Sequence, residues 1–228
     1  MIKKISFITK ILIFVTALIG VLFACIYARA DGYSHWTKRL LYFTNQSNLW
    51  IGIICLLTTV VNAKDKVKSE IKRLTYVTKF IFTVSITLTG LIFWVLLAPF
   101  ADQENYNVWT VASILTHIVV PVLAVFDFFY DDYKIILTKK HTLLAIIPPL
   151  IYFTFASILS VCQVDFGRGE NFPYFFMDFY SEAGLLGFVS GDLPQLGTVY
   201  WLVLILLIIL GIGFLYRVLN NNRIKKIK

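Results

Sequence analysis

Residues 40–63 read LLYFTNQSNLWIGIICLLTTVVNA, in which five uncharged polar residues, TNQSN at 44–48, interrupt an apolar run. A helix needs about 20 mostly apolar residues to cross a bilayer, and this run is long enough. Hydroxyl and amide side chains find no hydrogen-bonding partners in lipid. We therefore interpret residues 41–63 as a membrane span whose polar cluster faces other helices of the protein.

The rest of the chain has the same apolar character. Of its 228 residues, 58% are hydrophobic and the mean hydropathy is +0.77, which is too apolar for a soluble domain of this length. No internal repeat or low-complexity tract divides the chain. We predict an all-α polytopic membrane protein with six transmembrane helices in one domain, residues 1–228, with spans at 7–28, 41–63, 74–99, 108–130, 142–162 and 198–216.

The net charge of +8 arises from basic residues that gather on one side of the predicted membrane, which argues against nucleic-acid binding. That side carries Lys3, Lys4, Lys10, Lys64, Lys66, Lys68, Lys72, Arg73, Lys134, Lys139, Lys140, Arg217, Arg223, Lys225, Lys226 and Lys228. The other side carries Arg29, Lys38, Arg39 and Arg168, while Lys79 falls inside the third span. Because cytoplasmic connections are rich in Lys and Arg, both termini are predicted to be cytoplasmic. High Lys, Ile and Asn usage is typical of a bacterial source, so we expect the plasma membrane.

The first 30 residues also fit the pattern of a secretory signal peptide, because Lys3 and Lys4 precede an apolar run that ends at Ala28-Arg29-Ala30. That run of about 20 residues exceeds the 7–15 that are usual for a signal core. We therefore favour a retained first span, and cleavage stays the alternative.

The chain contains no pattern that indicates a metal or cofactor. Its three cysteines, Cys25, Cys55 and Cys162, have no paired spacing and predict neither a disulfide framework nor a metal motif. One histidine within the spans is not a metal site, so we expect neither a metal nor a cofactor.

The polar residues of the second span divide between faces of the helix. Thr44, Ser47 and Asn48 lie at i, i+3 and i+4 and share one face, whereas Asn45 and Gln46 point toward neighbouring helices or the outer interface. Interhelical hydrogen bonding, worth about 0.6 kcal/mol per contact, explains such residues without any catalytic role. Five of them together exceed what packing needs, which keeps a functional role open.

The fourth span contains the only histidine expected inside the bilayer, in THIVVPVLAVFD at 116–127. Ionisable residues within spans indicate function by default, and a neutral imidazole at His117 can act as a base near pH 7. Pro121 lacks an N–H and leaves the His117 carbonyl without its helical donor. Asp127 lies four residues before the inner boundary at Asp131, so it either has a function or reaches the cytoplasmic interface.

Helix depth makes a contact between the second and fourth spans uncertain. Thr44 lies 20 residues before Lys64, and His117 lies 14 residues before Asp131. If the inner ends are level, the two side chains differ in depth by about 9 Å at 1.5 Å per residue. Asn48 is then closer to the histidine in depth.

The fifth connection, residues 163–197, is long and includes the aromatic stretch NFPYFFMD at 171–178. Aromatic residues favour the membrane interface, so we predict a short segment that covers the outer mouth. Asp178 is a secondary candidate that faces either the mouth or the medium. Pro148-Pro149 is expected to kink the fifth span.

FTNQSN at 43–48, THIVVPVLAVFD at 116–127 and NFPYFFMD at 171–178, in this order and spacing, resemble bacterial six-span members of the androgen-induced, FAR-17a-like family of membrane proteins. The resemblance covers nearly the whole chain. It implies an intramembrane threonine hydrolase that cleaves lipid esters, such as fatty acid esters of hydroxy fatty acids. By this resemblance Thr44 is the nucleophile and His117 its partner.

The implied chemistry suits these residue types. A threonine hydroxyl is a weak nucleophile that needs an adjacent base, and a histidine can take and return its proton. The tetrahedral oxyanion needs hydrogen-bond donors, and the histidine needs an orienting group. Candidates for these two roles are Asn48, Asn45, Gln46 and Ser47. The substrate, a membrane lipid or acyl ester, would enter from the bilayer.

Two alternatives remain open. A transporter or channel would use the TNQSN layer and His117 as a polar pathway, and it would be expected to show repeats, discontinuous helices or several paired intramembrane charges. The sequence shows none of these clearly, so we place this alternative below the hydrolase. A non-catalytic scaffold or lipid-binding protein would use the same residues only for packing.

Overall fold

The computed structural model describes residues 2–64, 66–99, 108–190 and 195–227. Within these ranges six helical stretches are long and apolar enough to cross a membrane: Lys3–Ile26, Phe43–Ala63, Ser69–Leu97, Val111–Tyr130, Lys139–Val161 and Thr198–Lys226. The only strands in the same ranges are β1 (Phe188–Val189) and β2 (Gln195–Leu196), which pair antiparallel. The prediction of an all-α polytopic membrane protein is therefore confirmed.

The first three spans are long helices. α1 (Ile2–Ile26) leads through a 3-10 turn, η1 (Trp36–Leu41), into α2 (Phe43–Ala63). α3 (Ser69–Ile92) continues into a π-helical turn, η2 (Phe93–Leu97). Tyr42 has an extended backbone between η1 and α2, so α2 begins just before the polar cluster. Thr44 therefore lies in the first turn of a 21-residue helix.

The fourth span is not one regular helix. α4 (Val111–Ile114) passes into a π-helical turn, η3 (Leu115–Val119), and then into α5 (Val120–Tyr130). Pro121 cannot donate a backbone hydrogen bond, and the preceding Val120 N–H donates to Leu115, five residues back. The proline thus coincides with a change in the helical hydrogen-bond pattern beside His117.

The last two spans differ from the predicted boundaries. The fifth consists of α6 (Lys139–Leu144) and α7 (Ile147–Val161), and the break falls directly before Pro148-Pro149, where a kink is predicted. The sixth, α8 (Thr198–Ile227), continues beyond the predicted end at residue 216. Asn220 and Asn221 lie in this extension and bind backbone groups of Ile135 and Leu137, which docks the polar end of α8 onto the bundle.

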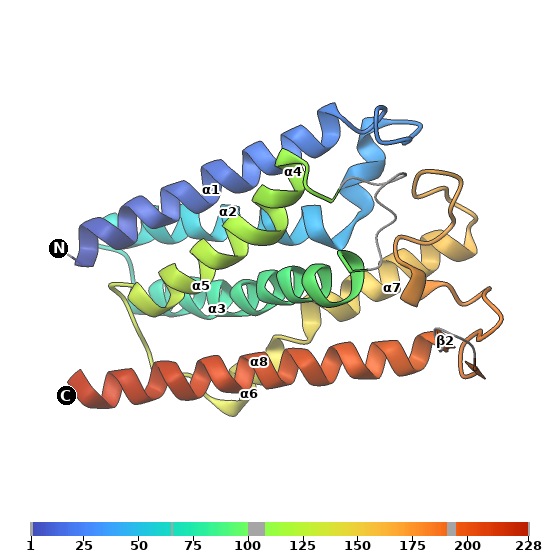
Figure 1. Ribbon diagram of the computed structural model, residues 1–228. Coiled ribbons are helices and arrows are strands. Elements are labelled where there is room, and N and C mark those ends of the chain that lie inside the picture. Colours follow the sequence, from blue (N-terminus) through green and yellow to red (C-terminus); the bar gives the residue numbers. More distant parts are fainter. Residues whose placement is uncertain (1, 65, 100–107, 191–194, 228) are drawn as a thin grey trace.

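Helix α3 lies at the centre of the bundle. It packs against α2 and α5 on one side and against α6, α7 and α8 on the other, while α1 packs along α2 and α5. Both termini lie at the same end of the bundle (Figure 1). Their predicted cytoplasmic location rests on the basic residues at that end.

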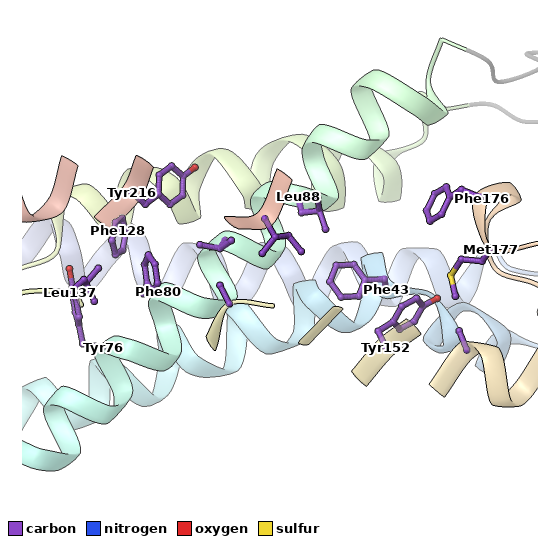
Figure 2. Close-up of a cluster of buried hydrophobic side chains, with 14 of the residues drawn as sticks. Phe43, Tyr76, Phe80, Leu88, Phe128, Leu137, Tyr152, Phe176, Met177 and Tyr216 are labelled. Carbon is purple, nitrogen blue, oxygen red and sulfur yellow. The ribbon is translucent and has the colours of Figure 1, made fainter. Parts of the chain in front are cut away.

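A core of buried hydrophobic side chains follows α3 through the bundle (Figure 2). It begins with Tyr76 and Phe80, continues to Leu88, and ends beside Phe176 and Met177. The last two belong to the fifth connection, where a 3-10 turn, η4, covers Phe175–Met177. The aromatic loop is thus packed into the core, which fixes the position of the residues next to it. Residues 191–194 of the predicted 163–197 loop lie outside the described residues.

Candidate active site

The structure brings Thr44 and His117 together. Thr44 Oγ1 lies 3.3 Å from His117 Nε2, within hydrogen-bonding distance. The depth difference of about 9 Å, which assumed level inner ends, does not separate the two side chains. Residues at different distances from the inner ends of the second and fourth spans therefore meet.

The hydrogen bonds of His117 define its tautomer. Its Nδ1 lies 3.1 Å from the Ser113 carbonyl oxygen and 3.3 Å from the hydroxyl oxygens of Ser113 and Thr116. A carbonyl oxygen can only accept, so the Ser113 carbonyl favours the tautomer in which Nδ1 carries the proton and donates to it. Nε2 is then unprotonated and presents its lone pair to the Thr44 hydroxyl. This is the arrangement that a general base requires.

Two π-helical turns hold the imidazole in place. His117 lies in η3, and Phe93, the first residue of η2, stacks on its ring with centroids 4.1 Å apart and planes 18° apart. π-Helical turns are rare and often occur at functional sites. The stacking leaves His117 little freedom to rotate away from Thr44, because Phe93 is itself almost fully buried.

Tyr174 is a site residue that the sequence analysis missed. Its hydroxyl oxygen lies 3.4 Å from the Thr44 backbone nitrogen, which donates to it. Burial raises the pKa of Tyr174 to about 12, so the hydroxyl keeps its proton at neutral pH. Tyr174 belongs to NFPYFFMD, but only Asp178 of that stretch was singled out. The sequence feature that points to Tyr174 is a hydroxyl-bearing aromatic residue in a segment that is predicted to cover the outer mouth.

Asn48 and Ser47 link α2 to its neighbours. The Asn48 amide donates to the carbonyl oxygens of Thr44 at 2.7 Å and Thr116 at 3.1 Å, which uses both of its N–H groups. Ser47 Oγ donates to the Thr44 carbonyl at 3.1 Å and contacts Thr89 Oγ1 at 2.9 Å. In this geometry Asn48 has no N–H left to donate to an oxyanion. Asn48 and Ser47 instead hydrogen-bond to neighbouring helices, as expected if their role is helix packing.

Asn45 and Gln46 turn toward the preceding 3-10 turn. Asn45 Nδ2 donates to the Arg39 carbonyl oxygen at 2.7 Å, and Gln46 Nε2 donates to that of Leu40 at 3.0 Å. Their amide N–H groups therefore tie η1 to the start of α2. Both side chains are predicted candidates for orienting His117, and the structure does not bring either of them to that histidine.

Asp127 belongs to a second, buried polar cluster. Lys10 Nζ lies 3.1 Å from Asp127 Oδ1 and 3.0 Å from Asp131 Oδ1, and Lys79 bridges the other oxygens of both carboxylates. The Ser6 hydroxyl donates to Asp131 Oδ1 and accepts a hydrogen bond from Lys10 Nζ. Asp127 is ten residues beyond His117, or about 15 Å along a helix, so it is not part of the Thr44 site. The pairing was missed although Lys79 and Asp127 both fell within predicted spans.

Asp178 has a local role in the loop. Its Oδ1 accepts a hydrogen bond from the Tyr180 N–H at 2.9 Å, and its carbonyl oxygen accepts one from the Ser181 hydroxyl. These bonds close the turn that follows η4. The structure does not bring Asp178 to Thr44 or His117. Among the described residues, His, Cys, Asp and Glu form no group of three that could hold a metal ion.

Two cavities meet at Thr44 and Tyr174. The outer one, about 370 Å³, has apolar and aromatic side chains over much of its wall, together with charged and polar groups that include Asp31, Arg39, His117, Arg168 and Glu170. The other is an apolar slot of about 60 Å³ between α2, α3, α7 and α8, with Leu88, Ile92, Phe153, Leu202 and Ile205 in its wall. Thr44 therefore lies where a cavity that contains charged groups borders an almost wholly apolar one.

Comparisons of the chain with protein-family models, with curated proteins and with solved structures found no match. The function is therefore argued from the geometry of the Thr44 site.

Proposed function

We propose that the protein is an intramembrane threonine-dependent hydrolase of lipid esters in the bacterial plasma membrane. One observation carries the proposal: Thr44 Oγ1 lies 3.3 Å from His117 Nε2, and Nδ1 of the same ring lies 3.1 Å from the Ser113 carbonyl oxygen. A nucleophile, a base and a group that orients the base are the three parts of a catalytic triad, whatever fold holds them.

The first half of the reaction acylates the threonine. As Thr44 Oγ1 attacks the ester carbonyl carbon, its proton passes to His117 Nε2, and the carbonyl π electrons move onto the oxygen. When the tetrahedral intermediate collapses, the bond to the leaving alkoxide breaks and Nε2 returns the proton to it. The Ser113 carbonyl stabilises the imidazolium that exists between these steps, because it accepts from Nδ1 throughout.

The second half releases the acid. A water molecule from the outer cavity attacks the acyl carbon and gives a proton to His117 Nε2, and collapse returns that proton to Thr44 Oγ1. The cavity of about 370 Å³ is large enough to hold several water molecules. His117 lines this cavity, so water can approach the base directly.

The two cavities support an amphiphilic substrate. A carbonyl carbon at Thr44 would have an apolar slot on one side and a polar cavity on the other. An acyl chain fits the slot by polarity, and because the slot holds only about 60 Å³, the chain would continue between the helices into the bilayer. Fatty acid esters of hydroxy fatty acids, which the family resemblance implies, are one such substrate.

Covalent labelling tests the proposal. A fluorophosphonate probe should modify the purified protein at Thr44, and Thr44→Ala and His117→Ala should each abolish labelling. Thr58→Ala is the matched control, because Thr58 lies in the same helix, is buried, and bonds only the Ile54 carbonyl. Labelling that persists in Thr44→Ala would overturn the assignment of the nucleophile. If that labelling is lost in Ser47→Ala, Ser47 is the nucleophile instead.

A transporter is the second candidate, and the buried cluster around Lys79 and Asp127 favours it. Val120 and Ala124, both almost fully buried, lie between His117 and Asp127 on the fourth span, so apolar residues separate the outer cavity from this cluster. A solute-uptake assay in proteoliposomes distinguishes the two candidates. If Lys79→Met abolishes uptake and Thr44→Ala leaves it intact, transport is favoured over hydrolysis.

A further inference from the structure

The proposed hydrolase needs donors for the oxyanion, and the polar layer of α2 does not supply them through its side chains. Both N–H groups of Asn48 are bound to backbone carbonyls of Thr44 and Thr116. Asn45 and Gln46 donate to Arg39 and Leu40. Asn45 and Gln46 each have a second amide N–H, but both side chains are turned toward η1, so donors closer to Thr44 Oγ1 come from another part of the site.

The start of α2 offers one. The first N–H groups of a helix have no intrahelical acceptor, and Thr44 is the second residue of α2. The Thr44 N–H points to the Tyr174 hydroxyl oxygen at a long distance of 3.4 Å. The helix dipole adds positive potential at the same place. A stronger acceptor that enters the site can therefore replace the Tyr174 hydroxyl oxygen as the acceptor of this N–H.

Tyr174 offers the second donor. Its hydroxyl lies beside both the N–H and the side chain of Thr44, and the residue lines both cavities. Its ring is stacked on Phe176 with centroids 5.1 Å apart and meets Tyr42 edge-on at 5.7 Å. This packing fixes the ring, so the hydroxyl can rotate its proton but cannot move far from Thr44.

The two donor atoms are correctly spaced for a single oxygen. An oxyanion should lie about 2.7–3.1 Å from each donor, and two atoms 3.4 Å apart allow one oxygen to satisfy both distances. The nucleophile, Thr44 Oγ1, belongs to the same residue that provides the N–H. We infer that the Tyr174 hydroxyl and the Thr44 backbone N–H form the oxyanion hole of this site, and that Tyr174 is its third catalytic residue.

This inference rests on the proposed function and adds a defined step to it. While the Thr44 Oγ1–carbon bond forms, the carbonyl π electrons move onto the oxygen, which then accepts hydrogen bonds from Tyr174 and from Thr44. When the leaving alkoxide departs, those electrons reform the double bond. Tyr174 donates a hydrogen bond in both half-reactions and keeps its proton, in agreement with its raised pKa.

Tyr174→Phe removes the donor and keeps the ring. With 4-nitrophenyl decanoate as the substrate, we expect kcat to fall about 100- to 1,000-fold while KM changes little. Tyr216→Phe is the matched control, because the Tyr216 hydroxyl also bonds a threonine, Thr87, at 3.1 Å but lines neither cavity. Its kcat should stay within about twofold of wild type.

A pair of inhibitors separates oxyanion binding from a structural role. A decyl trifluoromethyl ketone forms a tetrahedral adduct with the nucleophile and carries an oxyanion, whereas the corresponding decyl ether does neither. Tyr174→Phe should weaken the ketone at least tenfold and leave the ether unchanged. Equal weakening of both ligands would overturn the inference, because it would show that Tyr174 only shapes the site.

The outcomes also separate this inference from the proposed function. If wild-type protein hydrolyses the ester through Thr44 and Tyr174→Phe is equally fast, only the role of Tyr174 is refuted. If wild-type activity does not depend on Thr44, the hydrolase itself is refuted. Should Tyr174→Phe fail to fold, fluorotyrosine at residue 174 decides: kcat must change with the acidity of the phenol, and no change would overturn the inference.

Discussion

The backbone of Gly90 in α3 lies against the carbonyl oxygen of His117, so closely that a β-carbon at residue 90 would be 3.1 Å from that oxygen. The same β-carbon would be 3.3 Å from Pro121 Cβ. Pro121 has no N–H to cover the His117 carbonyl, and glycine at residue 90 lets α3 approach that carbonyl without any displacement. The position of His117, the proposed base, therefore depends on a residue that carries no functional group.

Gly90→Ala should displace η3 by a few tenths of an ångström and weaken the contact between His117 and Thr44. We expect at least a tenfold loss of kcat, because small misplacements of catalytic groups are costly. Gly211→Ala in α8 is the control, since its added β-carbon meets nothing within 4 Å. Wild-type kcat in Gly90→Ala would show that the close approach has no bearing on the site.

Asn48→Ala should affect stability more than catalysis. The change removes two hydrogen bonds that join α2 to itself and to η3, each worth about 0.5–1.5 kcal/mol. We expect a lower unfolding temperature in detergent and an unchanged preference for the trifluoromethyl ketone over the ether. A selective loss of ketone affinity would instead identify Asn48 as an oxyanion donor.

Ile205→Trp should change the chain-length preference. Ile205 lines the apolar slot, so a larger side chain would fill the space proposed for the acyl chain. Hydrolysis of 4-nitrophenyl palmitate should fall at least tenfold, while hydrolysis of the butyrate ester should fall much less. Leu207→Trp is matched in size and helix, but residue 207 is exposed on the bundle surface and should have no such effect. Equal losses with both esters would show that the slot does not hold the chain.

The buried charge cluster predicts acid sensitivity of the fold. Burial by itself raises the pKa of Asp131, but Lys79 and Lys10 outweigh it and hold that pKa below its usual range. The stability that Asp131 contributes is therefore complete above its unfolded pKa of about 3.9 and is lost as the pH falls through the folded value. The unfolding temperature in detergent should decline below about pH 4.

Asp131→Asn is the variant that checks this assignment. It should be less stable than wild type at pH 7, because Lys10 and Lys79 then share only Asp127, and its unfolding temperature should depend less on pH below pH 4. Asp178→Asn, at a loop carboxylate, should keep the wild-type profile. An unchanged acid profile in Asp131→Asn would locate the sensitivity elsewhere.

The six spans could be predicted from sequence because span length and hydropathy are local properties. The importance of Thr44 and His117 followed from their residue types and the family resemblance, but their contact did not. Depth counting assumed level helix ends, and the relative position of the second and fourth spans is set by packing over the whole bundle. The π-helical turn η2 is equally non-local, since FWVLL does not differ from an ordinary helical sequence, whereas for η3 Pro121 indicates where the helix changes but not that the change is a π-helical turn.

Tyr174 and the charge cluster were missed for different reasons. The position of a loop residue depends on what anchors the loop, here Phe176 and Met177 in the core, and no periodicity reveals that. The charges were visible in the sequence. Lys79 and Asp127 lie in different predicted spans, and a buried charge requires a partner, so the pair could have been proposed before the structure.

The meeting of two unlike cavities at Thr44 also bears on product release. After hydrolysis, the fatty acid would lie among α3, α7 and α8, next to the bilayer, while the alcohol half would face the polar cavity and the medium. In the proposed mechanism the alcohol half would leave first, toward the outer cavity, and the acid would follow after deacylation, toward the bilayer. Products that leave in different directions would seldom meet again at Thr44, which would disfavour re-formation of the ester.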